Sequence, residues 1–216
     1  MTFRTRILPV FVLAAALAGC AKEGELVVDQ GVGITAVLST CPAVGIPDYT
    51  GDITTFRQPG DSSYNNLNVT AAITNLRSTC NETGERVYSE ATFDVNARRF
   101  DTGSAQTVTL PYFVTVLRGG SAVVSKRVGD VTLTFAPEQE RASTQARAGA
   151  YVDRAAATLP EDIRERITRK RRAGDADAAL DPLAEPEVKA AIQRTRFEML
   201  VGFQLTEEQL AYNATR

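Results

Sequence analysis

The Cys20 thiol is the side chain whose position in the sequence predicts a definite chemistry. It follows a short basic start, an apolar stretch over 7–17 and the small residues at 18–19. This order is that of a secretory signal peptide with its cleavage site. The apolar stretch is too short for a membrane span, which needs roughly 20 residues. Removal of residues 1–19 would leave Cys20 at the start of the mature chain.

The sequence Leu17-Ala18-Gly19-Cys20 resembles the lipobox of bacterial lipoproteins. The resemblance implies that the signal is removed behind Gly19 and that fatty acids such as palmitate modify the Cys20 thiol. Two acyl chains give a stable membrane anchor, whereas one would be marginal. In such lipoproteins an Asp after the cysteine retains the protein in the inner membrane. Ala21 therefore implies the outer membrane, with the mature chain facing the periplasm.

The composition excludes several classes of chemistry. The 216 residues include no histidine, which excludes Ser-His-Asp and Cys-His catalysis and histidine-containing zinc sites. Loss of Arg4 and Arg6 with the signal takes the formal net charge from −2 to −4, which argues against a nucleic-acid partner. We expect no cofactor, no metal and no enzymatic activity.

Cys41 and Cys80 are the other two cysteines of the chain. In an oxidising compartment two such thiols are expected to form one disulfide, in preference to a reactive or metal-binding pair. Closing a loop of this size would stabilise the fold by about 4 kcal/mol in the chain-entropy model. We therefore predict a structural brace between Cys41 and Cys80.

Apolar and polar residues alternate between residues 32 and 152. This period of two indicates antiparallel strands with one buried face. The strand-like runs are 67–73, 87–97, 108–116, 131–135 and 142–152, the last of which also permits an Ala-rich helix. Gly119-Gly120 predicts a tight hairpin turn, the stretch 81–84 another turn, and Gly129-Asp130 a further break.

Several short strands with turns between them favour an antiparallel two-sheet sandwich with an immunoglobulin- or fibronectin-like layout. True immunoglobulin domains have a core tryptophan, and this chain has no tryptophan. The prediction therefore concerns the layout alone. The predicted organisation is a signal peptide at 1–19, a lipidated tether at 20–31, a β-sandwich at 32–152 and a helical C-terminal extension at 153–216.

Helix signals begin near Pro160 and Pro186, and Thr206 with Gln209 matches a capping box before a short last helix. The first of these helices carries a dense basic run. It could contact an anionic surface, such as lipid or lipopolysaccharide phosphates or an acidic protein, or it could be a solvated face paired with glutamates. The candidate contacts are Arg164, Arg166, Arg169, Lys170, Arg171 and Arg172.

The block 197–209 is unusually apolar for the end of a chain. It could dock on the sandwich as a helix end or a strand, or it could enter a groove of a partner protein. Together with the lipobox, its Val-Gly-Phe-Gln-Leu-Thr stretch at 201–206 resembles an uncharacterised family of alphaproteobacterial outer-membrane lipoproteins. That resemblance implies location and anchoring, and brings no catalytic residues with it.

These features favour a lipid-anchored cell-envelope protein that acts as a non-enzymatic interaction or scaffolding module in envelope assembly or maintenance. Its expected partners are the membrane, through acylated Cys20, and an envelope protein. One alternative is a glycan- or lipid-binding module at the periplasmic side of the outer membrane, using the polar loops at 49–55 and 62–68. A second is a carboxylate-based hydrolase, with pairs such as Glu138 and Glu140 or Asp175 and Asp177.

Overall fold

The computed structural model of the chain describes residues 39–170, 174–177 and 180–215. Cys20, the signal, the tether and the start of the predicted β domain lie outside these residues, as do Arg171 and Arg172. The chain divides into two compact units. The larger one, Thr35–Ile167 with Asp181–Arg216, contains both sheets and the candidate site.

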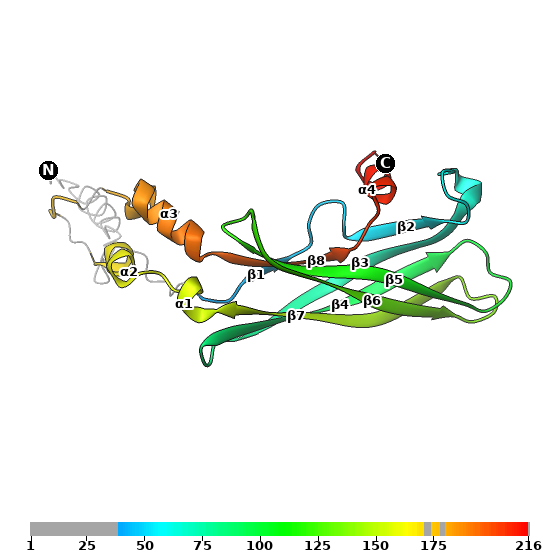
Figure 1. The fold of residues 1–216 in the computed structure, drawn as a ribbon, viewed down its shortest axis with the longest axis horizontal. Helices are drawn as coiled ribbons and strands as arrows, with labels where there is room; N and C mark the ends of the chain where they lie inside the picture. Colours follow the sequence, from blue (N-terminus) through cyan, green and yellow to red (C-terminus); the bar gives the residue numbers. More distant parts are fainter. Residues whose placement is uncertain (1–38, 171–173, 178–179, 216) are drawn as a thin grey trace, which may run out of the picture. The chain divides into compact units, whose positions relative to one another are not determined.

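The larger unit is mainly β, as predicted, and has two four-stranded sheets (Figure 1). The first, which we call the β3 sheet, is antiparallel throughout and has the order β2 (Asp52–Phe56), β3 (Leu67–Asn81), β4 (Arg86–Arg99) and β7 (Arg141–Asp153). The second, the β5 sheet, has the order β1 (Ala43–Gly45), β8 (Phe197–Phe203), β5 (Gln106–Arg118) and β6 (Ala122–Phe135). Among the described strands, only β1 pairs in parallel with its neighbour.

The apolar residues of the alternating pattern predicted from the sequence form the core. In β4, Val87, Ser89, Ala91, Phe93 and Val95 are buried on one face, while the residues that alternate with them are less buried. The β5 sheet adds its own buried side chains to the same apolar cluster, namely Leu110, Leu133, Phe135, Met199, Val201 and Phe203. Because both sheets contribute to one cluster, they pack face to face in a sandwich-like arrangement.

The glycine turns are confirmed, but the predicted break in β6 is wrong. Gly119 and Gly120 have φ angles of 64° and 78° and join β5 to β6. At Gly129 the strand continues without interruption. A Cβ there would lie 3.1 Å from the ring of Tyr112, the cross-strand neighbour of Gly129. The missing side chain makes room for the tyrosine ring and does not end the strand.

The predicted helices are present in the C-terminal region. They are α2 (Glu161–Thr168), α3 (Pro186–Thr195) and α4 (Glu207–Thr215). The structure adds a short helix that was not predicted, α1 (Arg154–Ala157), and two 3-10 turns, η1 (Tyr64–Asn66) before β3 and η2 (Pro182–Ala184) before α3. The capping box is confirmed, since Thr206 N donates to Gln209 Oε1 at 2.9 Å and Gln209 N to Thr206 Oγ1 at 3.2 Å. Within the described ranges, none of the helices has the length and apolar character needed to span a bilayer.

The prediction of a helical extension over 153–216 is wrong for residues Phe197–Phe203, which form strand β8. This strand lies between β1 and β5, inside the β5 sheet. Its alternate residues Phe197, Met199, Val201 and Phe203 are buried against the core. The apolar block therefore docks on the sandwich as a strand, which is one of the two outcomes that its composition permitted.

The predicted disulfide between Cys41 and Cys80 is present, with the Cα atoms 6.1 Å apart. Cys41 precedes β1 and Cys80 lies at the end of β3, so the bond fastens the edge of one sheet to the other sheet. Beside it, Glu82 Oε1 accepts hydrogen bonds from Ser39 Oγ at 2.6 Å and Thr40 N at 3.1 Å. The bond from Ser39 lowers the pKa of the Glu82 carboxyl.

A buried arginine closes one end of the sandwich. Arg99, at the end of β4, is only 2% exposed. Its guanidinium donates to backbone carbonyls in two connections, Thr102 and Ser104 between β4 and β5, and Ala136 and Gln139 between β6 and β7. It also lies 5.5 Å from the centre of the Phe135 ring. Satisfying a buried guanidinium with four carbonyls ties both connections to β4.

Candidate functional site

The outer face of the β3 sheet brings together polar residues from three strands. The antiparallel register places Thr70 of β3 opposite Arg98 of β4, and Arg98 opposite Arg141 of β7. The next row on the same face contains Ala72, Asn96 and Ser143. Because side chains alternate along each strand, these two rows face solvent while their sequence neighbours fill the core.

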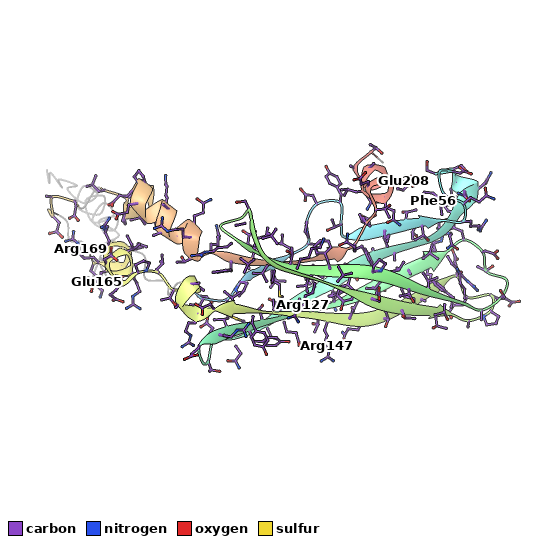
Figure 2. The ribbon with its side chains drawn as sticks, in the orientation of Figure 1. Phe56, Arg127, Arg147, Glu165, Arg169 and Glu208 are labelled. Atoms are coloured by element: carbon purple, nitrogen blue, oxygen red, sulfur yellow. A yellow bond between two sulfur atoms is a disulfide. The ribbon has the colours of Figure 1, made fainter. Side chains whose placement is uncertain are left out.

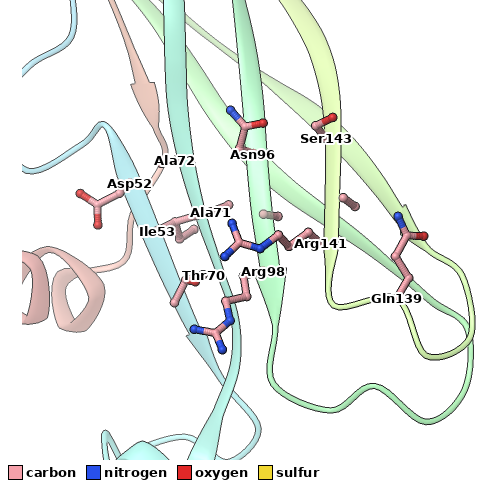
Figure 3. Close-up of a pocket in the computed structure, with 12 residues that line it drawn as sticks. Asp52, Ile53, Thr70, Ala71, Ala72, Asn96, Arg98, Gln139, Arg141 and Ser143 are labelled. Carbon is pink, nitrogen blue, oxygen red and sulfur yellow. The ribbon is translucent and has the colours of Figure 1, made fainter.

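A hollow of about 560 Å³ lies over these rows (Figure 3). Thr70, Ala72 and Ser143 contribute small side chains to its lining, and Arg98 and Arg141 contribute long ones. In Figure 3 both guanidinium groups lie over this face of the sheet, and Asp52 lies on the side of β2. The hollow is open, which suits an extended ligand better than an enclosed small molecule.

The charges of the hollow favour an anionic ligand. Arg98 pairs with Glu140 and stacks 5.2 Å from the Phe100 ring. Arg141 has no ion pair within the part of the chain that the structure describes. Like charges directly opposite one another on antiparallel strands destabilise a sheet. A carboxylate or phosphate held between the two guanidinium groups would remove this repulsion and match their fork of donors.

Polar side chains in the hollow and in the rows beside it already bind one another. Asn96 Nδ2 donates to Thr74 Oγ1 at 2.7 Å, and Asn75 Nδ2 donates to Asp94 Oδ2 at 2.9 Å. Gln145 Nε2 also reaches Asp94, at 3.4 Å. This network fixes the side chains next to the hollow and leaves the two arginines as its principal donors.

An aromatic pair lies farther along the same face. Tyr88 and Tyr151 are cross-strand neighbours with ring centres 4.8 Å apart, and the Arg86 guanidinium lies 4.8 Å from the Tyr151 ring. The Tyr88 hydroxyl donates to Glu90 Oε2 at 2.9 Å, which raises the pKa of Tyr88. Tyr151 is 56% exposed. The pair therefore offers an exposed ring surface beside the polar rows.

The stretches predicted to be ligand-binding loops are loops only in part, because residues 52–55 of the first belong to strand β2 and residues 67–68 of the second to strand β3. Asn213 Nδ2 of α4 donates to the carbonyls of Tyr49 and Asp52, both at 2.8 Å. In the second loop Asn66 is buried, and its Nδ2 donates to the Gln58 carbonyl at 2.8 Å. The backbone of the first loop and Asn66 of the second are thus engaged within the protein, whereas the ring of Tyr64 is 75% exposed.

The structure places acidic partners beside the arginines of the basic run that it describes. Arg164 pairs with Glu161, and Arg169 pairs with Asp177. Arg166 Nη1 lies 3.2 Å from Glu185 and 2.9 Å from Glu187. Lys170 is exposed, and Arg171 and Arg172 lie outside the described residues. These pairs correspond to the solvated-face alternative, and contact with an anionic surface stays a prediction.

The carboxylate pairs considered for hydrolysis have one member each in an ion pair, because Glu140 binds Arg98 and Asp177 binds Arg169. Among the described residues that line the hollow, Asp52 supplies the only carboxylate. In the same described ranges, no cluster of three or more Cys, Asp or Glu residues is arranged to hold a metal ion.

Sequence reasoning did not single out Arg98 and Arg141. Each lies one residue beyond a predicted strand, Arg98 after 87–97 and Arg141 before 142–152, in phase with the outward positions of that strand. This phase is the signal that could have identified them, but the pairing register that places them side by side is not readable from the sequence. Comparisons of the chain with protein-family models, curated proteins and solved structures gave no match. The geometry of this face is therefore the basis for assigning a function.

Proposed function

We propose that the protein is a lipid-anchored, non-enzymatic binding module of the cell envelope that holds a partner protein on the outer face of its β3 sheet. In this proposal acylated Cys20 anchors the chain in the outer membrane, facing the periplasm. The lipobox and its preceding apolar segment support the anchor. The hollow beside Arg98 and Arg141 is the observation that carries the binding role.

The partner that suits this hollow is an acidic peptide segment in extended conformation. A side-chain carboxylate would lie between the two guanidinium groups, and Asn96 and Ser143 would hydrogen-bond the flanking backbone. Binding fits this lining better than turnover, because its charged groups are two arginines, which keep their protons, and one carboxylate, while its other side chains are amides, hydroxyls and apolar groups. General acid-base work generally needs a second titratable group at a defined separation.

In-cell photocross-linking tests the binding role. A photoreactive residue at Ser143, inside the hollow, is expected to capture one specific envelope protein, and Arg98→Ala with Arg141→Ala should abolish the capture. The matched control places the same group at Glu208, which is exposed on α4 (Figure 2). Capture that does not depend on the two arginines, or equal capture at Glu208, would contradict the proposal.

Labelling with radioactive palmitate tests the anchor separately. The wild-type chain should incorporate the label and sediment with outer membranes, whereas Cys20→Ser should incorporate none. If both chains remain unlabelled, the anchor is wrong while the binding face remains testable on its own.

A second candidate, a glycan-binding module, is favoured by the Tyr88–Tyr151 pair. Exposed aromatic rings beside hydrogen-bonding groups offer an apolar surface together with polar contacts, a combination common in ligand sites. Retention of the full chain on purified peptidoglycan that is lost in Tyr151→Ala, and kept in Arg141→Ala, would favour this candidate over the protein partner.

For the fold we propose an immunoglobulin-like relationship at the level of architecture. Two packed and mainly antiparallel sheets support it, as do the chain crossings from β4 to β5 and from β6 to β7. The strand order differs from that of an immunoglobulin domain. Here β2, β3 and β4 are neighbours in one sheet in chain order, whereas in immunoglobulin domains strand B pairs with strand E.

A further inference from the structure

Strand β6 is an edge of the β5 sheet, and its first half is exposed on both faces. Val123, Val124 and Val128 are 65%, 56% and 58% exposed, although valines are usually buried. Farther along the strand, Val131 and Phe135 return to the core. In the part of the chain that the structure describes, β6 pairs with β5 alone. A long edge with exposed valines is a template for another strand.

The other three sheet edges are blunted. Strand β1 has only three residues. Strand β2 has five, with a register irregularity between Thr55 and Phe56, and α4 binds its backbone. On β7, the carbonyl of Arg147 accepts a hydrogen bond from Tyr112 of the other sheet at 2.9 Å. Such devices prevent edge pairing. In β6 a register irregularity lies opposite Val116 and Leu117, near the start of the strand, and among the described residues the stretch 125–130 lacks these devices.

We propose that β6 pairs antiparallel with β6 of a second copy of this chain, about a twofold axis at Val128. In this register Lys126 of each copy lies opposite Asp130 of the other. Lys126, Val128 and Asp130 share the outer face of the sheet, since they pair with the alternate β5 residues Thr115, Phe113 and Pro111. Two ion pairs would flank a contact between the two Val128 side chains.

Charge complementarity selects both the partner and the register. Within one strand Lys126 and Asp130 are four residues apart, about 13 Å, so they cannot pair with each other. Neither has an ion pair among the described residues. An axis at Arg127 would oppose two arginines, and an axis at Asp130 would oppose two aspartates. An axis at Val128 neutralises both charged residues of the outer face.

The pairing would also close on itself. A twofold contact uses the same surface in both copies, so the dimer would consume both exposed edges and would not grow into a fibre. The basic half of the strand, which contains Arg127 (Figure 2), would lie beside the acidic half of its copy. This inference is independent of the binding face on the β3 sheet.

Cysteine cross-linking tests the register. In the full chain in detergent, Val128→Cys places two thiols across the axis, where antiparallel Cα atoms are about 4.5–5.5 Å apart and a disulfide can form. We expect most of this variant to become a covalent dimer on mild oxidation. The matched control, Thr134→Cys, is exposed on the same strand and face, but its copies would lie about 40 Å apart. Cys20 is present in both variants, so any linkage through it affects them equally.

A charge exchange tests the complementarity. Lys126→Asp or Asp130→Lys alone is expected to weaken the dimer roughly tenfold in sedimentation equilibrium, because each puts like charges opposite one another twice. The double variant restores both pairs and should return to within about threefold of the wild type. These side chains are exposed, so the fold should persist, and near-UV circular dichroism checks it. A wild-type chain that stays monomeric at about 100 μM, no excess of linked Val128→Cys over Thr134→Cys, or failure of the double variant to restore the dimer would overturn the proposal.

Discussion

Strands β2 and β6 are both sheet edges, but β2 is covered by another part of the chain and the first half of β6 is exposed. Strand β2 is short, and α4 lies against it: Asn213 and Gln209 donate to its carbonyls, and Tyr212 packs edge-on to Phe56 at 5.3 Å. Strand β6 has 14 residues and three exposed valines. An edge can be satisfied by the chain's own side chains or left available for association. This contrast supports the proposal that the open edge of β6 pairs with a second copy of the chain.

The largest effect is expected from the disulfide, which fastens the β1 edge. Replacing both Cys41 and Cys80 by Ser should lower the free energy of unfolding by about 4 kcal/mol, since the bond closes a loop with a sequence separation of 39. Urea unfolding of the full chain measures this, with the reduced wild type as a comparison. A loss below about 1 kcal/mol would mean that the β1 edge is held by its pairing with β8 alone.

The next effect concerns Arg99, which holds the end of β6 that is not exposed. Arg99→Met should cost about 3 kcal/mol, because it removes the buried guanidinium that donates to four backbone carbonyls. The neighbouring Arg98→Met is the matched control, since Arg98 is exposed and should change stability by less than about 1 kcal/mol. We call Arg99 and its four carbonyl partners the Arg99 clamp. Equal losses of stability for the two variants in urea unfolding would show that this clamp does not secure this end of the strand.

The smallest effect is expected where α4 covers β2. Asn213→Ala removes two hydrogen bonds to the backbone and should cost about 2 kcal/mol. It should also raise concentration-dependent association in light scattering, because it uncovers an edge. Glu208→Ala, on an exposed position of α4, should change neither quantity by much. Destabilisation without added association would weaken the contrast between the two edges.

Much of the β3 sheet could be predicted from the sequence, because β4 and β7 alternate cleanly between polar and apolar residues. The Thr206–Gln209 capping box was predictable because it is local, and the disulfide because Cys41 and Cys80 were the two cysteines besides Cys20. Strand β8 was expected within a helical region because its outward positions are also apolar in part, as at Leu200. A strand with neighbours on both sides has no fully polar face to reveal its period.

The hollow and the Arg99 clamp could not be predicted, because both depend on relations between distant segments. Arg98 and Arg99 are adjacent in the sequence and chemically identical, yet one faces solvent and the other lies in the core. Alternation predicts that they face opposite ways. It does not predict that carbonyls from two connections surround the second, or that Arg141 lies opposite the first.

The clamp has a consequence for how freely its surroundings can vary. Arg99 is held by main-chain oxygens, and every residue type at positions 102, 104, 136 and 139 supplies the same oxygen. Related chains could therefore exchange the side chains of both connections while keeping the closure, provided that the loops retain their length and path. At position 99 itself, only a side chain with the reach and the several donors of arginine would serve.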